Sequence, residues 1–150
     1  MSAVTTSPPP IAYRRPSVDD IAPDGSKIRL LVGSAEAATR ASLCEVTLEA
    51  GLTSYSVAHQ TVEEIWYVLE GHGEVWRSEP SQPSAEPLPV GPGAALVIPT
   101  GWHFQFRASP AGPLRFLCYT SPPWPGSAEA KPVRSGPLGG SPPPTRELLE

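Results

Sequence analysis

The chain has 150 residues, 39% of them hydrophobic, which is enough to fill the core of one modest domain. Its 21 prolines and 13 glycines exclude a helical bundle, because each proline in a helix interior costs about 3 kcal/mol. The net charge is −4 and like charges form no long runs. The composition therefore gives no sign of a basic surface that would bind nucleic acid or an anionic membrane.

The prolines are unevenly placed, and their placement predicts the domain boundaries. Five lie within the first 23 residues, eight lie from Pro122 to Pro144, and none lies between Pro23 and Pro80. We therefore expect a Pro-rich N-terminal arm at 1–25, a folded unit at 26–126 and a flexible C-terminal tail at 127–150. The N-terminus lacks the basic and apolar regions of a signal peptide, so we expect a cytoplasmic protein.

Strands are predicted where apolar residues recur with period two. In the first half of the chain this pattern covers 27–32, 44–48 and 55–59, and in the last of these Tyr55, Val57 and His59 share a face. The next run, EIWYVLEG at 64–71, is apolar on both faces, and a strand pattern resumes at 74–77. Because two glycines flank His72 between these strands, we predict a hairpin at 71–73 and a first strand buried on both sides.

The second half of the chain also consists of short predicted strands separated by turns. Residues 78–92 are rich in Pro and Ser and predict a loop with at most one short strand. Further strands are expected at 94–98, 102–107 and 114–120. Short strands with turn signals about every ten residues are typical of an all-β closed barrel or two-sheet jelly roll.

Two apolar features complete the expected core. Cys44 and Cys118 lie inside apolar runs and form no metal-binding or redox spacing, so we expect two buried free thiols. The segment SPPWPG after the last strand is expected to pack back on the barrel through Trp124.

Two spacings of Gly, His, Glu and Pro resemble the two motifs of the cupin family. The first motif matches at Gly51, His59, Glu64 and Gly71, and the second matches at Gly93, Pro99 and Gly101. The resemblance covers about residues 26–126. It implies a small single-domain cupin, that is, a jelly-roll β-barrel, to which the proline placement adds Pro-rich N- and C-terminal tails.

Cupins usually hold a divalent metal through two His and a Glu of the first motif and a His of the second. Here Val57 and Phe104 stand at two of these positions, which leaves His59 and Glu64. His103 precedes the second-motif position by one residue, so it faces inward only if a bulge turns it. Two expectations remain open: no metal, or one Fe, Mn, Ni or Zn ion held by His59, Glu64 and His103.

The resemblance places His59 and Glu64 inside the barrel cavity. An ionisable pair is costly to bury among aromatic rings unless something uses it. Without a metal, the carboxylate is expected to raise the pKa of His59 and make it a general acid or base near neutral pH, with Tyr55 as an auxiliary donor. A slip of one residue would place Glu63 inward instead, and a purely structural buried pair is the alternative.

Three functions therefore stand as hypotheses. The first is an enzyme that isomerises, cyclises or dehydrates a small organic substrate by proton transfer, with His59, Glu64 and Tyr55. The second is a metal-dependent oxygenase or lyase that uses His59, Glu64 and His103, and the third is a cupin that binds a small ligand without turnover. Small cupins usually pair, so a homodimer is also expected, with the outward side chains of 64–71 covered.

Overall fold

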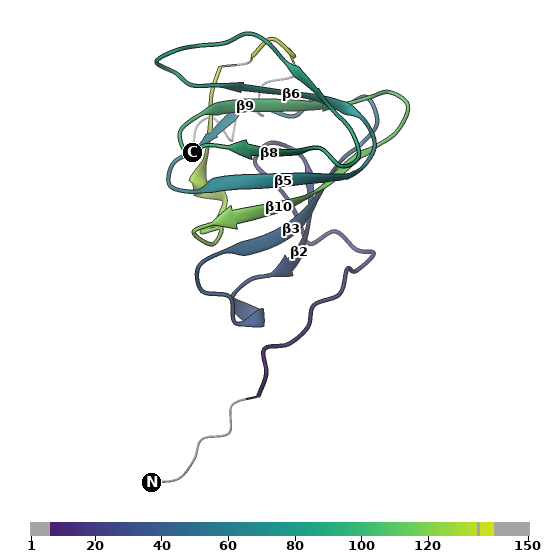
Figure 1. Cartoon of the computed structure of the whole chain (residues 1–150), viewed down its shortest axis with the longest axis vertical. Coiled ribbons are helices and arrows are strands. Elements are labelled where there is room, and N and C mark those ends of the chain that lie inside the picture. Colours follow the sequence, from purple (N-terminus) through teal and green to yellow (C-terminus); the bar gives the residue numbers. More distant parts are fainter. Residues whose placement is uncertain (1–6, 135, 140–150) are drawn as a thin grey trace.

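The computed structural model describes residues 7–134 and 136–139, and nearly all of its regular structure is β-strand. Two antiparallel sheets face each other and enclose the interior (Figure 1). The predicted all-β jelly-roll barrel is thus confirmed. Within the described residues, no helix is long and apolar enough to cross a membrane.

The first sheet has six strands in the order β1, β2, β3, β10, β5, β8. Their bounds are Asp20–Ile21 (β1), Lys27–Val32 (β2), Ser42–Leu48 (β3), Leu114–Ser121 (β10), Glu63–Glu70 (β5) and Ala95–Ile98 (β8). A short 3-10 helix, η1 at Ser34–Glu36, connects β2 to β3. The strands β2, β3, β10 and β5 supply many of the residues that line the candidate site.

The second sheet has five strands in the order β11, β4, β9, β6, β7. Their bounds are Ala130–Pro132 (β11), Val57–His59 (β4), His103–Ala108 (β9), Gly73–Ser78 (β6) and Leu88–Val90 (β7). A second 3-10 helix, η2 at Ser127–Glu129, precedes β11. The loop at 78–92 therefore contains one short strand, β7, as the sequence predicts.

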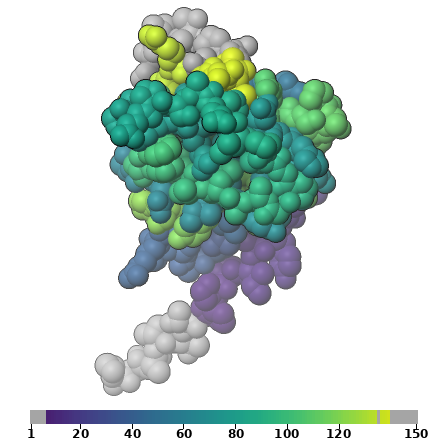
Figure 2. All heavy atoms as spheres, turned by 45° about the horizontal axis from the view of Figure 1, so that its top comes forward, coloured from purple at the N-terminus to yellow at the C-terminus, as the bar shows by residue number. Residues whose placement is uncertain are grey.

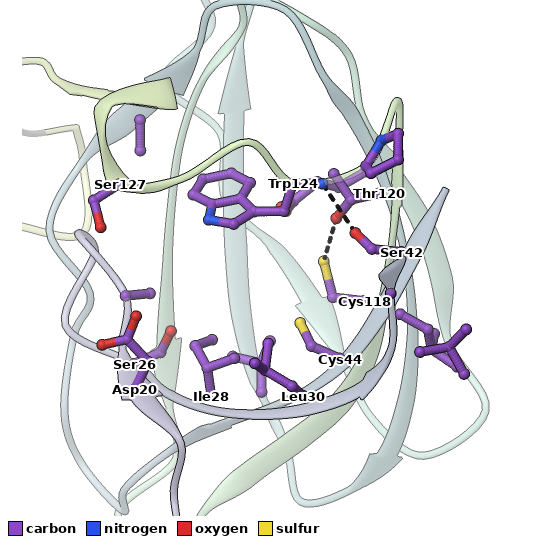
Figure 3. Close-up of a pocket in the computed structure, with 18 of the residues that line it drawn as sticks. Asp20, Ser26, Ile28, Leu30, Ser42, Cys44, Cys118, Thr120, Trp124 and Ser127 are labelled. Atoms are coloured by element: carbon purple, nitrogen blue, oxygen red, sulfur yellow. Dashed lines mark hydrogen bonds between the residues drawn. The ribbon is translucent and has the colours of Figure 1, made fainter. Parts of the chain in front are cut away.

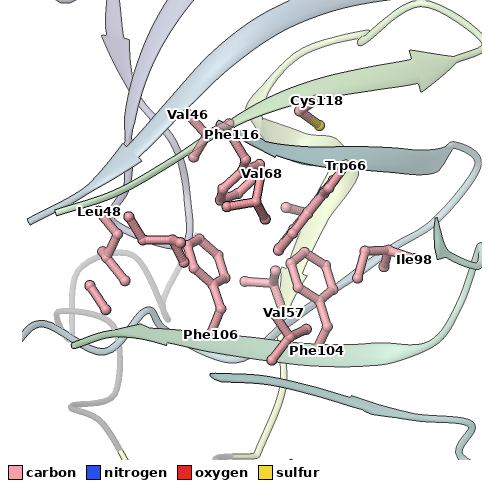
Figure 4. Close-up of a cluster of buried hydrophobic side chains, with 14 residues drawn as sticks. Val46, Leu48, Val57, Trp66, Val68, Ile98, Phe104, Phe106, Phe116 and Cys118 are labelled. Atoms are coloured by element: carbon pink, nitrogen blue, oxygen red, sulfur yellow. The ribbon is translucent and has the colours of Figure 1, made fainter. Parts of the chain in front are cut away.

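The core is an aromatic cluster to which both sheets contribute (Figure 4). Trp66 of β5 stacks on Phe116 of β10, with ring centroids 4.1 Å apart. Phe106 and Phe104 of β9 meet Trp66 edge-on from the opposite sheet, at 5.0 and 5.9 Å. The edge-on contacts between the sheets are an arrangement that aromatic rings prefer, so they help to fix how the two sheets pack.

The predicted hairpin at 71–73 is wrong, because β5 and β6 belong to different sheets. The chain turns a corner there and crosses from one sheet to the other. The expectation that β5 is buried on both faces is also wrong within one chain, since Ile65 and Tyr67 are 45% and 48% exposed. Sequence periodicity reports which residues are apolar, but it does not report which strand pairs with which.

The barrel also extends beyond the predicted limits of 26–126. β1 lies in the predicted arm and pairs with β2, and β11 lies in the predicted tail and pairs with β4. The buried carboxylate of Glu129 holds the C-terminal segment in place by accepting hydrogen bonds from the backbone N–H groups of Thr61 and Val62. Residues 1–6 of the predicted arm and 140–150 of the predicted tail lie outside the described residues.

The first and the last described segments of the chain lie at opposite ends of the barrel. In the space-filling view the C-terminal segment, yellow, packs against one end of the barrel, and the N-terminal arm, purple, lies at the other (Figure 2). Trp124 follows β10 and packs against the core, as predicted. Its backbone N–H donates a hydrogen bond to the Ser42 hydroxyl of β3, which fixes the return of this segment to the barrel.

Candidate active site

A cavity of about 390 Å³ lies in the barrel interior, next to the aromatic core (Figure 3). This volume is within the range of sites that take small organic molecules. Most of its walls are aliphatic or aromatic. The apolar side chains that line it include Ile28, Leu30, Val46, Val57, Trp66, Phe116 and Trp124.

His59, at the end of β4, is 4% exposed and lines this cavity. Its ring lies edge-on between the rings of Phe104 and Trp124, with centroids 5.1 and 5.3 Å away. Within the described part of the chain, its Nδ1 is buried and has no hydrogen-bond partner. Burial lowers the pKa of His59 to about 4, and the Glu129 carboxylate opposes this shift only in part. The imidazole is therefore neutral at pH 7.

Glu64, on β5, reaches the cavity from the other sheet and is 8% exposed. Trp66 Nε1 donates a hydrogen bond of 2.9 Å to its Oε1. Burial raises the pKa of Glu64 to about 7, and the nearby carboxyl of Asp24 adds to this shift, although the Trp66 hydrogen bond opposes it. Glu63 is exposed on the outer face of β5, so the structure settles which of the two acidic residues faces inward.

The two side chains come close without forming a hydrogen bond, because His59 Nε2 lies 3.9 Å from Glu64 Oε2. The predicted pair is therefore together in the cavity, but its predicted electrostatics are wrong. The sequence predicts that the carboxylate raises the pKa of His59, whereas burial lowers it. Glu64, not His59, is the group that changes charge near neutral pH.

Tyr55 does not lie in this cavity, contrary to expectation. It lies two residues before β4 begins at Val57, so the alternation of that strand does not extend to it. Its backbone N–H donates to the Asp24 carbonyl, and its ring lies over Gly25. Tyr55 instead borders a second hollow with Leu48 and Thr53.

His103 is not brought to His59 and Glu64, contrary to the hypothesis of a reduced metal site. It pairs with Ala58 in the β4–β9 ladder, and its neighbour Phe104, 1% exposed, takes the inward position. Regular alternation in β9 therefore turns His103 away from the cavity. Within the described residues, no group of three or more His, Cys, Asp and Glu side chains is arranged to hold a metal ion. With Val57 and Phe104 at the other two motif positions, the donor set does not fit the metal centre that the resemblance implies.

Comparison with known proteins agrees with this architecture. A family model described as the cupin domain matches residues 44–120, which span both motifs and the strands β3 to β10. The chain belongs to the cupin family. No curated protein matches this cupin at a significant level.

Three solved structures illustrate the shared fold. The polyketide cyclase RemF from Streptomyces resistomycificus has 24% identity and a TM-score of 0.59, over 91% of this chain and 89% of that one. PAC13 from Streptomyces, solved with uridine, has 15% identity and a TM-score of 0.59, over 87% and 93% of the two chains. KdgF from Halomonas sp. has 19% identity and a TM-score of 0.57, over 71% and 86%. At these identities the likeness concerns the fold.

The sequence pattern does not point to the other acidic residues of this cupin's cavity, among them Asp24. It lies in the predicted arm, yet it lines the cavity and accepts hydrogen bonds from the backbone N–H and hydroxyl of Ser26. Burial raises the pKa of Asp24. The Asp-Gly-Ser sequence at 24–26, a typical turn, is the signal that could have extended the domain to include it.

The charges around the cavity are all acidic. Its charged lining residues are Asp20, Asp24, Glu36 and Glu64, and no Lys or Arg lies among the described lining residues. Three arginines near the cavity instead form ion pairs with Glu45, whose side chain lies on the opposite face of β3 from the cavity. These are Arg14, Arg29 and Arg115. The cavity thus presents apolar walls and carboxyl groups to a ligand.

Proposed function

We propose that this cupin is an enzyme that isomerises, cyclises or dehydrates a small, uncharged organic molecule by proton transfer. In this proposal neutral His59 is the general base and protonated Glu64 is the general acid. The observation that carries it is the burial of both groups, unbonded to each other, in one largely apolar cavity. The proposal keeps His59 and Glu64 and leaves out Tyr55.

The protonation states support these roles. With a pKa of about 4, His59 has a free lone pair at pH 7 and can accept a proton from a carbon or hydroxyl group. With a pKa of about 7, Glu64 is about half protonated at that pH and can donate a proton to an oxygen that leaves or becomes an enol. Because Trp66 binds Oε1, Oε2 remains available for the substrate.

The chemistry of the walls supports an uncharged and largely apolar substrate. A carboxylate or phosphate group would lie near four carboxyl groups without a basic partner, which is unfavourable. The rings of Trp66, Phe116 and Trp124 suit a flat molecule. The polyketide cyclase among the similar structures makes cyclisation the first reaction to test.

The test is a turnover assay with neutral linear poly-β-ketones as substrates. The aromatic products are detected by their absorbance and by mass spectrometry. Replacing the acid in Glu64→Gln is expected to lower kcat/KM by about 100-fold or more, as for a lost general acid. Glu63→Gln is the matched control, because Glu63 lies next to Glu64 but faces solvent, and it should leave kcat/KM unchanged. In the unmodified enzyme kcat should fall as the pH rises through about 7, where Glu64 loses its proton.

Three outcomes would overturn the proposal. Full activity of Glu64→Gln would show that Glu64 is not the general acid. Stoichiometric metal that is lost in His59→Ala would favour the metal-dependent hypothesis. Tight binding of these molecules without any turnover would favour a ligand-binding cupin.

A further inference from the structure

Cys44 and Cys118 form a pair that the proposed proton transfer does not use. Cys44 is in β3 and Cys118 is in β10, and the register of these neighbouring strands places the two residues directly opposite each other. Both line the cavity, and both sulfur atoms point into it (Figure 3). The sequence predicts two buried free thiols, but it does not show that they lie opposite each other, because that depends on how the strands pair.

The position of the pair fits the geometry of a disulfide. Residues directly opposite in an antiparallel ladder have Cα atoms about 4.5–5.5 Å apart, and disulfides join residues whose Cα atoms are about 4.4–6.8 Å apart. The two side chains also lie on the same face of the sheet. The bond can therefore form without a change of register.

The two thiols differ in their surroundings. Cys118 is 2% exposed, and its Sγ lies 3.8 Å from the Thr120 hydroxyl. Burial raises the pKa of Cys118 well above its usual range, and Cys44 and Glu64 add to this effect. Cys44 is only partly buried. A small oxidant thus meets Cys44 first, and Cys118 is placed to react second.

We propose that Cys44 and Cys118 form a dithiol site that small-molecule disulfides, such as oxidised glutathione, convert to a disulfide between β3 and β10. The Cys44 thiolate attacks the small disulfide, forms a mixed disulfide and releases one thiolate. Cys118 then loses its proton to solvent and attacks Cys44 Sγ, which releases the second small thiol. Overall, two protein thiols are oxidised and one small disulfide is reduced to two thiols.

The test uses the full chain, reduced, freed of reductant and incubated with oxidised glutathione at mildly alkaline pH. Free thiols are then alkylated, and peptides are mapped by mass spectrometry. The expected product is a peptide pair joined through Cys44 and Cys118 within one chain. The oxidised protein should also unfold at a higher temperature than the reduced protein, because the bond restricts the unfolded chain.

Single-cysteine variants separate the two steps. In Cys118→Ser, and in Cys118→Ala as a second form, the reaction should stop at glutathione bound to Cys44. In Cys44→Ser, Cys118 should stay reduced while the protein is folded. The proposal is overturned if the unmodified chain accumulates glutathione on Cys44 with Cys118 free, forms only disulfides between chains, or keeps both thiols reduced.

Discussion

His59 and Glu64 share one cavity, but their pKa values shift in opposite directions. Burial disfavours the charged form of each, so it lowers the pKa of the base from 6.5 to about 4 and raises that of the acid from 4.5 to about 7. A charged pair would need a close hydrogen bond to offset the loss of hydration, and 3.9 Å does not provide one. Burial is thus the main cause that keeps the imidazole neutral at pH 7 and the carboxyl about half protonated.

This pair predicts opposite pH dependences of stability for two variants. In Glu64→Gln, His59 is the only titratable member of the pair that remains. The unfolded chain binds the His59 proton more tightly than the folded chain does, so the free energy of unfolding should fall as the pH drops from about 6.5 to 4. In His59→Gln only Glu64 remains, and the folded chain binds its proton more tightly. Stability should then fall as the pH rises from about 4.5 to 7.

Each effect amounts to about 3 kcal/mol at most, from 1.36 kcal/mol per pKa unit. In the unmodified chain the two contributions offset each other, so its stability should vary less over this range. Urea unfolding at the two ends of the range measures the difference. Parallel curves for the two variants would contradict the assigned pKa shifts.

The identity of this pair could be predicted from the sequence, but its electrostatics could not. The spacing from Gly51 to Gly71 was enough to select His59 and Glu64 over His72 and Glu63. The sign of the His59 shift depends on how Phe104 and Trp124 exclude water from its ring. Those residues come from distant parts of the chain, so no local pattern contains this information.

At the scale of elements, the corner between β5 and β6 decides how the chain passes from one sheet to the other. Gly71 has a φ of +85°, and a Cβ there would lie 2.0 Å from the Pro113 carbonyl oxygen. At Gly73 a Cβ would lie 2.0 Å from the Arg107 carbonyl oxygen. The glycines at 71 and 73 therefore let two backbones approach closely, whereas the sequence alone suggested a hairpin turn.

Replacing one of these glycines should destabilise the barrel. Gly71→Ala places a methyl group against backbone that cannot move away, so we expect a loss of at least about 2 kcal/mol in the free energy of unfolding. Gly112→Ala is the control, because a Cβ there would have no heavy atom within 4 Å. Denaturant unfolding of both variants checks this. Equal stabilities would show that the corner tolerates a side chain.

β9 shows both the strength and the limit of reasoning from alternation. The pattern predicts that Phe104 and Phe106 face inward and that His103 faces the other way, and the structure agrees. Gln105 lies on the same outer face as His103, yet it is fully buried. Its amide donates hydrogen bonds to the carbonyls of Ser54 and Gly139, because the C-terminal segment covers that face.

At the scale of the whole molecule, an apolar patch lies on the outer face of the first sheet. It spans β10, β5 and β8 and consists of Ile65, Tyr67, Val97 and Tyr119, each between 38% and 48% exposed. The strand registers place Ile65 opposite both Val97 and Tyr119. We propose that this patch is the interface of the expected homodimer, because large exposed apolar patches are typical of protein–protein interaction sites.

The dimer is tested by the mass of the protein in solution at micromolar concentration. The unmodified chain should have the mass of a dimer, and Tyr67→Lys should shift it to a monomer by placing a charge in the patch. Leu88→Lys is the control, since Leu88 is similarly exposed, at 47%, but lies on β7 of the other sheet. A monomeric unmodified chain, or the same shift in both variants, would contradict the assigned interface.

The sequence by itself determined the fold class, the cupin motifs and two of the ionisable residues of the cavity, His59 and Glu64, because strand periodicity and motif spacing are local properties. Only the tertiary structure decided the partners of each strand and the extent of the barrel. It also placed Cys44 opposite Cys118 and left Tyr55 and His103 outside the cavity. These features, like the pKa values of His59 and Glu64, depend on contacts between residues far apart in the chain.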